Sequence, residues 1–72
     1  MKKAEAAGAT FGARLKALRA AAGLSQQQLA DAAALSGKAF VWQLEHGRRE
    51  PGWGVLCRLA DALGVGLDAF RG

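Results

Sequence analysis

The feature that most constrains this chain is the stretch from Gly23 to Gly47, which reads GLSQQQLADAAALSGKAFVWQLEHG. A serine precedes each of two short runs with helical apolar spacing: Ser25 stands before the first run and Ser36 before the second. The turn between the runs is too short to let two helices lie side by side, so the helices must cross at a steep angle. The stretch therefore predicts a helix-turn-helix at about residues 25–46.

A further helix is predicted on the N-terminal side of this pair. Thr10 is a favourable N-cap residue, and Phe11, Leu15 and Leu18 follow it at spacings of four and three, as on one face of a helix. Gly23 is the residue type that commonly ends a helix. We therefore expect the first helix to lie between Thr10 and Gly23.

The remaining elements follow from the same kinds of signal. Ser25 and Gln28 form a capping-box pattern at the start of the second helix. No segment alternates apolar and polar residues as a half-buried strand would. The expected fold is all-α with five helices, of which the last four span about residues 26–33, 38–45, 53–63 and a single turn at 66–70.

Length and charge set limits on what the chain does. Seventy-two residues make one domain, in which we expect residues 1–9 to form a flexible tail and residues 10–72 to fold. The net charge of +4 favours association with a polyanion, because such association releases counterions. Cys57 is the only cysteine, so we expect no internal disulfide and a small, buried thiol in a reducing compartment.

Several classes of protein find no support in the sequence. No apolar run approaches the ~20 residues that a membrane span needs, and the first five residues lead into no signal-peptide core. The chain has no paired-carboxylate site, metal-ligand cluster or glycine-rich phosphate loop. We therefore expect a cytoplasmic protein that is not an enzyme, has no membrane partner and binds neither a cofactor nor a metal.

Three segments together carry a family resemblance: FGARLKALRAAAGLSQQQLADAAALS, QLEHGRREP and LCRLADALGVGLDAF. In this order and spacing they resemble the lambda-repressor-like, Cro-type helix-turn-helix domains of the XRE family. The resemblance covers Phe11 to Phe70. It implies that the chain is a DNA-binding transcription regulator of the repressor type, of bacterial or phage origin and associated with the nucleoid.

The start of the second helix is the expected phosphate site. Ser25 and the first amides of that helix make a positively polarised end that favours an anion. Gln26 has the reach to donate to a phosphate oxygen, and the resemblance implies that it clamps the DNA backbone, with Gln27 as a weaker candidate. The resemblance also places Arg48 and Arg49 on phosphates. The alternatives are an exposed helix-favouring glutamine at Gln26 and a solvated turn at the two arginines.

The third helix is expected to read bases. If Val41 and Leu44 point inward, the residues on or near the groove-facing side are Lys38, Ala39, Trp42 and Gln43. Gln43 fits a bidentate contact to adenine, and Lys38 reaches guanine or a phosphate. Trp42 packs on thymine methyls or the sugar backbone, or instead serves as a core or partner-interface aromatic. This surface is poor in hydrogen-bonding side chains.

Two further expectations concern the geometry of this helix. The resemblance pairs Arg19 with Glu45 in a charge-assisted contact that clips the helix to the scaffold, against the alternative of two separate surface charges. Ser36 precedes Glu45 by nine positions, where the family usually has eight. The extra residue is most simply Gly37, because glycine tolerates a positive φ. Either Ser36 or Gly37 then caps the helix.

Two functions from different classes remain open at this point. The first is repression by occupancy, in which a homodimer binds double-stranded DNA at half-sites about 34 Å apart. Its candidate dimer surface lies around Val65, Leu67 and Phe70, although these residues equally well close the core. The second is a protein-interaction module, antitoxin-like or coactivator-like, that binds a protein partner through Phe40 and Trp42.

Overall fold

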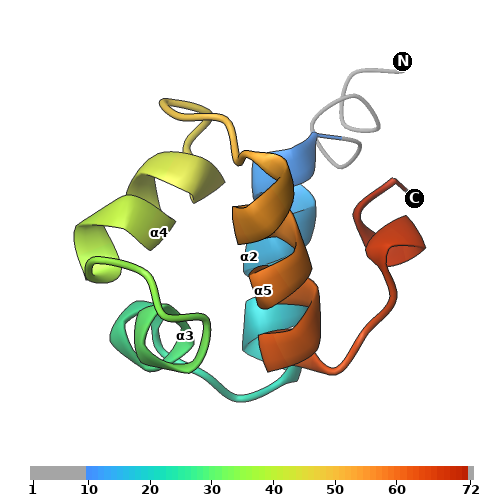
Figure 1. The fold of residues 1–72 in the computed structure, drawn as a ribbon, viewed down its shortest axis with the longest axis horizontal. Helices are drawn as coiled ribbons and strands as arrows, with labels where there is room; N and C mark the ends of the chain where they lie inside the picture. Colours follow the sequence, from blue (N-terminus) through green and yellow to red (C-terminus); the bar gives the residue numbers. More distant parts are fainter. Residues whose placement is uncertain (1–9, 72) are drawn as a thin grey trace.

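The computed structural model describes residues 10–71, which form four α-helices and one short 3-10 helix (Figure 1). The elements are α2 (Phe11–Ala21), α3 (Gln26–Ala32), α4 (Lys38–Glu45), α5 (Trp53–Leu63) and η1 (Leu67–Phe70). This range contains no strand, so the all-α prediction is confirmed. The fifth element is a single 3-10 turn rather than an α-helix. The tail expected at residues 1–9 lies outside the described residues.

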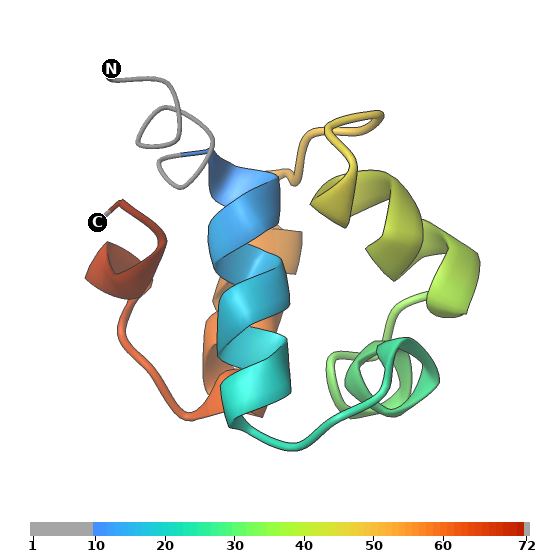
Figure 2. The same cartoon turned by 180° about the vertical axis from the view of Figure 1, so that it is seen from behind.

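The helices divide into two groups around a central pair. Helices α3 and α4 lie to one side of α2 and α5, and η1 lies to the other side (Figures 1 and 2). Helices α3 and α4 also contact each other closely, as the two halves of a helix-turn-helix do. No helix within residues 10–71 has the length and hydropathy to cross a lipid bilayer.

Every α-helix contributes an apolar side chain to one core. The largest fully buried side chains are Leu15, Leu29, Val41, Leu44 and Leu59. Full burial of such a side chain contributes about 1.5–3 kcal/mol relative to exposure. The inward orientation predicted for the two α4 residues of this set is therefore correct, and it fixes which face of α4 remains available.

Local capping explains where the first two helices begin. The hydroxyl of Thr10 accepts a hydrogen bond from the backbone N–H of Ala13 at 3.1 Å. At α3 the predicted capping box is confirmed: the N–H of Gln28 donates to Ser25 Oγ at 3.0 Å, and the N–H of Ser25 donates to Gln28 Oε1 at 2.8 Å. These bonds satisfy amides that a helix start leaves without an internal partner.

The start of α4 differs from this pattern. Gly37 occupies the N-cap position, and no side chain caps the helix, so Ser36 does not serve as the cap. The φ of Gly37 is 165°, which is extended backbone that any residue adopts. The left-handed conformation that glycine tolerates is therefore not used at Gly37. The turn instead places its left-handed residue earlier, at Ala34, where φ is 58°.

Ala34 ends α3 in the way that glycines end the other helices. The N–H of Leu35 donates to the carbonyl of Ala30 at 2.8 Å, and the N–H of Ala34 donates to that of Asp31 at 3.3 Å. This pair of bonds is a Schellman motif, whose left-handed position is usually glycine. Gly23 holds that position after α2. The turn of the helix-turn-helix thus carries a residue with a conformational penalty.

We expect Ala34→Gly to raise the free energy of unfolding by about 0.5–1 kcal/mol. A left-handed conformation costs an L-residue about 1–2 kcal/mol, and the greater chain entropy of glycine in the unfolded state removes part of that gain. Urea denaturation followed by circular dichroism measures the change. Ala17→Gly, at an exposed position inside α2, is the matched control and should lower stability by about 1 kcal/mol. A destabilised Ala34→Gly variant would contradict the account of this turn.

Candidate nucleic-acid interface

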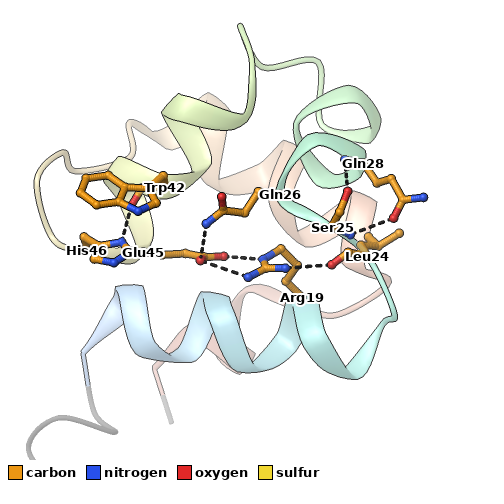
Figure 3. A network of polar contacts seen from close by, with 8 residues as sticks. All are labelled: Arg19, Leu24, Ser25, Gln26, Gln28, Trp42, Glu45 and His46. Atoms are coloured by element: carbon orange, nitrogen blue, oxygen red, sulfur yellow. Dashed lines mark hydrogen bonds and ion pairs between the residues drawn. The ribbon is translucent and has the colours of Figure 1, made fainter.

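An ion pair between Arg19 and Glu45 joins α2 to the last residue of α4 (Figure 3). Arg19 Nε lies 2.6 Å from Glu45 Oε2, and Arg19 Nη2 lies 3.3 Å from Glu45 Oε1. The carboxylate is almost completely buried, with 1% of its side chain exposed. Arg19 Nη1 also donates to the carbonyl of Leu24 at 2.9 Å. One guanidinium therefore ties α4 to both α2 and the loop that leads into α3.

Gln26 belongs to the same cluster. Its Nε2 donates to Glu45 Oε1 at 3.0 Å, so the first residue of α3 is bonded to the last residue of α4 (Figure 3). A carboxylate only accepts hydrogen bonds, which fixes the amide nitrogen on the side of Glu45. The side chain predicted to clamp a phosphate is thus half-buried and held in a defined orientation. Its phosphate contact stays a prediction.

Gly12 brings α2 and α4 into close contact, and sequence reasoning missed it. The residue is buried in the first turn of α2, and a Cβ added there would fall on the main-chain carbonyl oxygens of Leu44 and Glu45. Only the absence of a side chain lets the backbone of α4 approach this closely. The available signal was a glycine within an otherwise alanine-rich helix, at a position where glycine costs stability.

The face of α4 opposite the core carries the residues predicted to read bases. Lys38, Ala39 and Trp42 are exposed and Gln43 is half-buried. These four therefore lie on or beside the outer face of α4, as the inward orientation of its apolar residues requires. Base contact itself stays a prediction, because burial alone does not identify what the face binds.

Trp42 forms a preorganised surface with two residues that follow α4. Its ring stacks on the imidazole of His46, with centroids 3.9 Å apart and planes 16° from parallel (Figure 3). The Nδ1 atom of His46 lies 2.9 Å from the carbonyl oxygen of Trp42, and the Arg48 guanidinium lies 5.9 Å from the Trp42 ring. Trp42 is 42% exposed, so it is not a core residue. Sequence reasoning did not foresee this stack.

The side chain of Arg49, in the loop after α4, extends toward the N-terminal end of that helix and contacts two of its residues. Its Nε donates to Gln43 Oε1 at 3.0 Å, and its guanidinium lies 4.7 Å from the ring centroid of Phe40. An arginine expected on a phosphate is thus engaged by two side chains of the helix that precedes it. The Arg48 guanidinium instead lies over the Trp42 ring, and its backbone N–H donates to the carbonyl of Gln43 at 2.8 Å, so the two neighbouring arginines are held differently.

The remaining phosphate candidates lie at the start of α3. Ser25 is exposed, and its hydroxyl accepts the capping bond described above. Gln27 is exposed and donates through Nε2 to Asp31 Oδ1 at 2.9 Å, one turn further along α3. Within residues 10–71, no three His, Cys, Asp or Glu side chains gather as a metal site requires.

An open groove of about 690 Å³ lies between the first turn of α2, the start of α5 and η1, and it is also lined by Leu44 of α4 and by the loop between α4 and α5. Trp53 borders it and is 70% exposed. Of the residues proposed for a dimer surface, Phe70 is buried and its ring lies 5.3 Å from that of Phe11, while Val65 and Leu67 are half-buried against the core. Those three residues mainly close the core, and the exposed large apolar side chain that borders this groove is Trp53.

Residues 10–71 match a family model described as a helix-turn-helix domain. The chain is also similar to the restriction-modification controller protein C.AhdI from Aeromonas hydrophila, whose crystal structure is known at high resolution. The two are 35% identical, the match covers 86% of this chain and 92% of that one, and the TM-score is 0.81. No curated protein matches the chain.

Proposed function

Because the chain belongs to the helix-turn-helix domain family of DNA-binding transcription regulators, we propose that it acts by inserting α4 into the major groove of double-stranded DNA. The observation that carries this proposal is the way α4 is held. Its inner face is anchored by buried Val41 and Leu44 and its end by Glu45, while Ala39 and Trp42 remain exposed. A reading helix requires one face fixed to a scaffold and the other free.

Contacts to the DNA backbone would come from both ends of the helix pair. The start of α3 offers a capped, positively polarised helix end at Ser25. Gln26 donates one amide hydrogen to Glu45 and retains the other for a phosphate oxygen. Exposed Arg48 lies beside Trp42 just after α4. Phosphate contacts of this kind set the position and orientation of the reading helix on the duplex.

We propose that regulation works by occupancy, in the manner of a repressor. A helix seated in the major groove would itself keep other proteins off that site, so blocking the site is the simplest effect of binding. C.AhdI is a restriction-modification controller protein. Its similarity to this chain over most of both lengths supports a controlling role exercised through DNA.

Useful affinity for DNA calls for two copies of the chain. One reading helix contacts only a few base pairs, and a two-fold dimer doubles the contact at half-sites about 34 Å apart. We propose that the second copy packs against the groove beside Trp53, because Trp53 is the most exposed large apolar side chain of residues 10–71 and lies outside the outer face of α4. Sedimentation equilibrium tests the idea: a Trp53→Ser variant that self-associates as strongly as the parent protein would contradict it.

A salt titration tests the proposed DNA interface. We expect the affinity for a random-sequence duplex to fall as salt rises, because each neutralised phosphate contributes about −0.9 to the slope of log K against log salt concentration. Arg48→Gln should reduce the magnitude of that slope by about 0.9. Lys16→Gln removes the same charge from an exposed position on α2, away from α4, and should leave the slope unchanged. Fluorescence anisotropy of labelled DNA measures all three.

The salt dependence tests the phosphate contacts, and the two variants test where on the surface the DNA binds. DNA binding without any salt dependence would contradict the phosphate contacts. An equal loss of slope in the Arg48 and Lys16 variants would mean that general charge, and not the surface beside α4, attracts the DNA.

A second function is favoured by one specific observation, the exposed stack of Trp42 on His46. Exposed aromatic side chains with a fixed orientation are frequent anchors in protein interfaces. If the domain binds a protein through α4, Trp42→Ala will abolish capture of that protein, and the parent domain will show no measurable affinity for DNA in the titration above.

A further inference from the structure

The two glutamines of the helix-turn-helix are held by opposite ends of their amide groups. Gln26 is held by its nitrogen, which donates to Glu45 at 3.0 Å. Gln43 is held by its oxygen, which accepts from Arg49 Nε at 3.0 Å. We propose that Arg49, by engaging the amide oxygen of Gln43, leaves Gln43 to read a base through its Nε2 donors and so to select guanine over adenine. The inference rests on the proposed function, because it concerns which base α4 reads.

Arg49 is well placed to fix the amide of Gln43. Its guanidinium packs over Phe40 at 4.7 Å from the ring centroid, and its Nε reaches Gln43 one turn further along the same helix. Two contacts on α4 thus define the position of the arginine. A planar guanidinium with a fixed stem loses less freedom for each hydrogen bond than a flexible ammonium does.

The direction of the amide follows from chemistry alone. A guanidinium carries N–H donors and no acceptor, so only the oxygen of Gln43 can face Arg49. The Nε2 atom of Gln43 makes no hydrogen bond to another residue in the range 10–71. Both of its N–H groups are therefore available to an incoming ligand. The Nη groups of Arg49 add further donors beside them.

This arrangement fits one base better than the other. In the major groove adenine offers an acceptor at N7 and a donor at N6, whereas guanine offers acceptors at both N7 and O6. A glutamine whose oxygen is free matches adenine. A glutamine whose oxygen is held by an arginine presents its Nε2 donors to the base, and donors match guanine. Arg49 is thus a positioning residue for Gln43, and the adenine contact expected from sequence is replaced by a guanine contact.

Selection of bound duplexes from a random library, followed by sequencing, tests the inference. The base pair read by Gln43 is the one whose preference disappears in Gln43→Ala. At that pair the parent protein should enrich guanine over adenine by about tenfold, which is within the range of one specific base contact. Arg49→Met keeps an apolar stem against Phe40 but removes the donor, and it should shift the enrichment toward adenine by about tenfold.

Two control variants separate orientation from charge. Arg48→Met removes the same charge from the neighbouring position, whose guanidinium lies over Trp42 and whose only bond to Gln43 in the range 10–71 is from its backbone N–H to the Gln43 carbonyl, and it should weaken binding without changing the preferred base. Arg49→Lys retains a donor and should retain the preference for guanine. The inference is overturned if the parent protein prefers adenine at this pair, or if Arg49→Met keeps the parent preference.

A measurement on the free protein separates this inference from the proposed function. In NMR spectra without DNA, Gln43→Ala should shift the Nε–H resonance of Arg49, and Arg49→Met should shift the side-chain amide of Gln43. Unshifted resonances overturn the inference whatever the protein binds. If the resonances shift but no duplex is enriched, the proposed function has failed and the guanine selection fails with it.

Discussion

Replacing Arg19 with methionine is expected to lower the free energy of unfolding by about 3–5 kcal/mol, the usual result of removing one partner from a buried ion pair. The Glu45 side chain is 1% exposed, so without the guanidinium its charge is left out of water with only the Gln26 amide as a partner. A domain of this size has only about 4–11 kcal/mol in total, at 0.05–0.15 kcal/mol per residue. Most of the stability would therefore be lost.

The loss should be measured by urea denaturation, with two comparison variants. Arg14→Met changes the same residue type on the same helix, but Arg14 Nε is buried and has no hydrogen-bond partner among residues 10–71, so we expect a change within about 1 kcal/mol. The double variant Arg19→Met with Glu45→Met removes both charges and should recover much of the lost stability. A double variant as unstable as Arg19→Met alone would show that the buried charge is not the cause.

The same substitution is expected to weaken DNA binding. Arg19 also donates to the carbonyl of Leu24, so its removal loosens the loop before α3 as well as the end of α4. The start of α3 and helix α4, which are both proposed to contact DNA, are then no longer held in a fixed position relative to each other. Binding measured at a temperature where the variant is still folded should fall, and the double variant should restore stability more fully than affinity.

Gly12→Ala is expected to lower the free energy of unfolding by about 1–3 kcal/mol, as overpacking of a close contact does. The added methyl group would meet the main-chain carbonyls of Leu44 and Glu45, and a backbone atom gives way less readily than the end of a side chain. Helices α2 and α4 must then separate. Thermal unfolding followed by circular dichroism measures the change.

Gly54→Ala is the matched control for this prediction. It makes the same substitution in the first turn of α5, where the added Cβ would meet only the end of the Arg58 side chain at 3.6 Å. There alanine should raise stability by about 0.5–1 kcal/mol through its better helix propensity. Changes of the same sign at both glycines would contradict the close contact at Gly12.

The features that could be predicted from sequence are those set by neighbouring residues. The capping box of Ser25 with Gln28 depends on a spacing of three and on side-chain chemistry alone, and it is present in the structure. The buried face of α4 follows from helical periodicity in the same way. The starts and ends of the four α-helices lie within about a residue or two of the expected positions, as local signals allow.

The features that could not be predicted depend on how the helices cross. The contact of Gly12 with α4 and the bond from Gln26 to Glu45 each join residues far apart in the chain. Nothing in the local sequence determines which atoms meet there. The left-handed residue of the turn was missed for a different reason. Glycine is the usual residue at that position, and the extra residue was placed at Gly37, whereas the end of α3 has the left-handed conformation at Ala34. The position at which α3 ends, rather than the preference of any residue type, determines which residue of the turn is left-handed.

The stack of Trp42 on His46 also gives the domain an optical reporter. The chain has two tryptophans, and they lie on separate surfaces: Trp42 on the outer face of α4 and Trp53 at the first residue of α5. In a Trp53→Phe variant the remaining indole emission would come from Trp42 alone, beside an imidazole ring 3.9 Å away. Arrival of a ligand at α4 would then be visible in the fluorescence of the unlabelled protein.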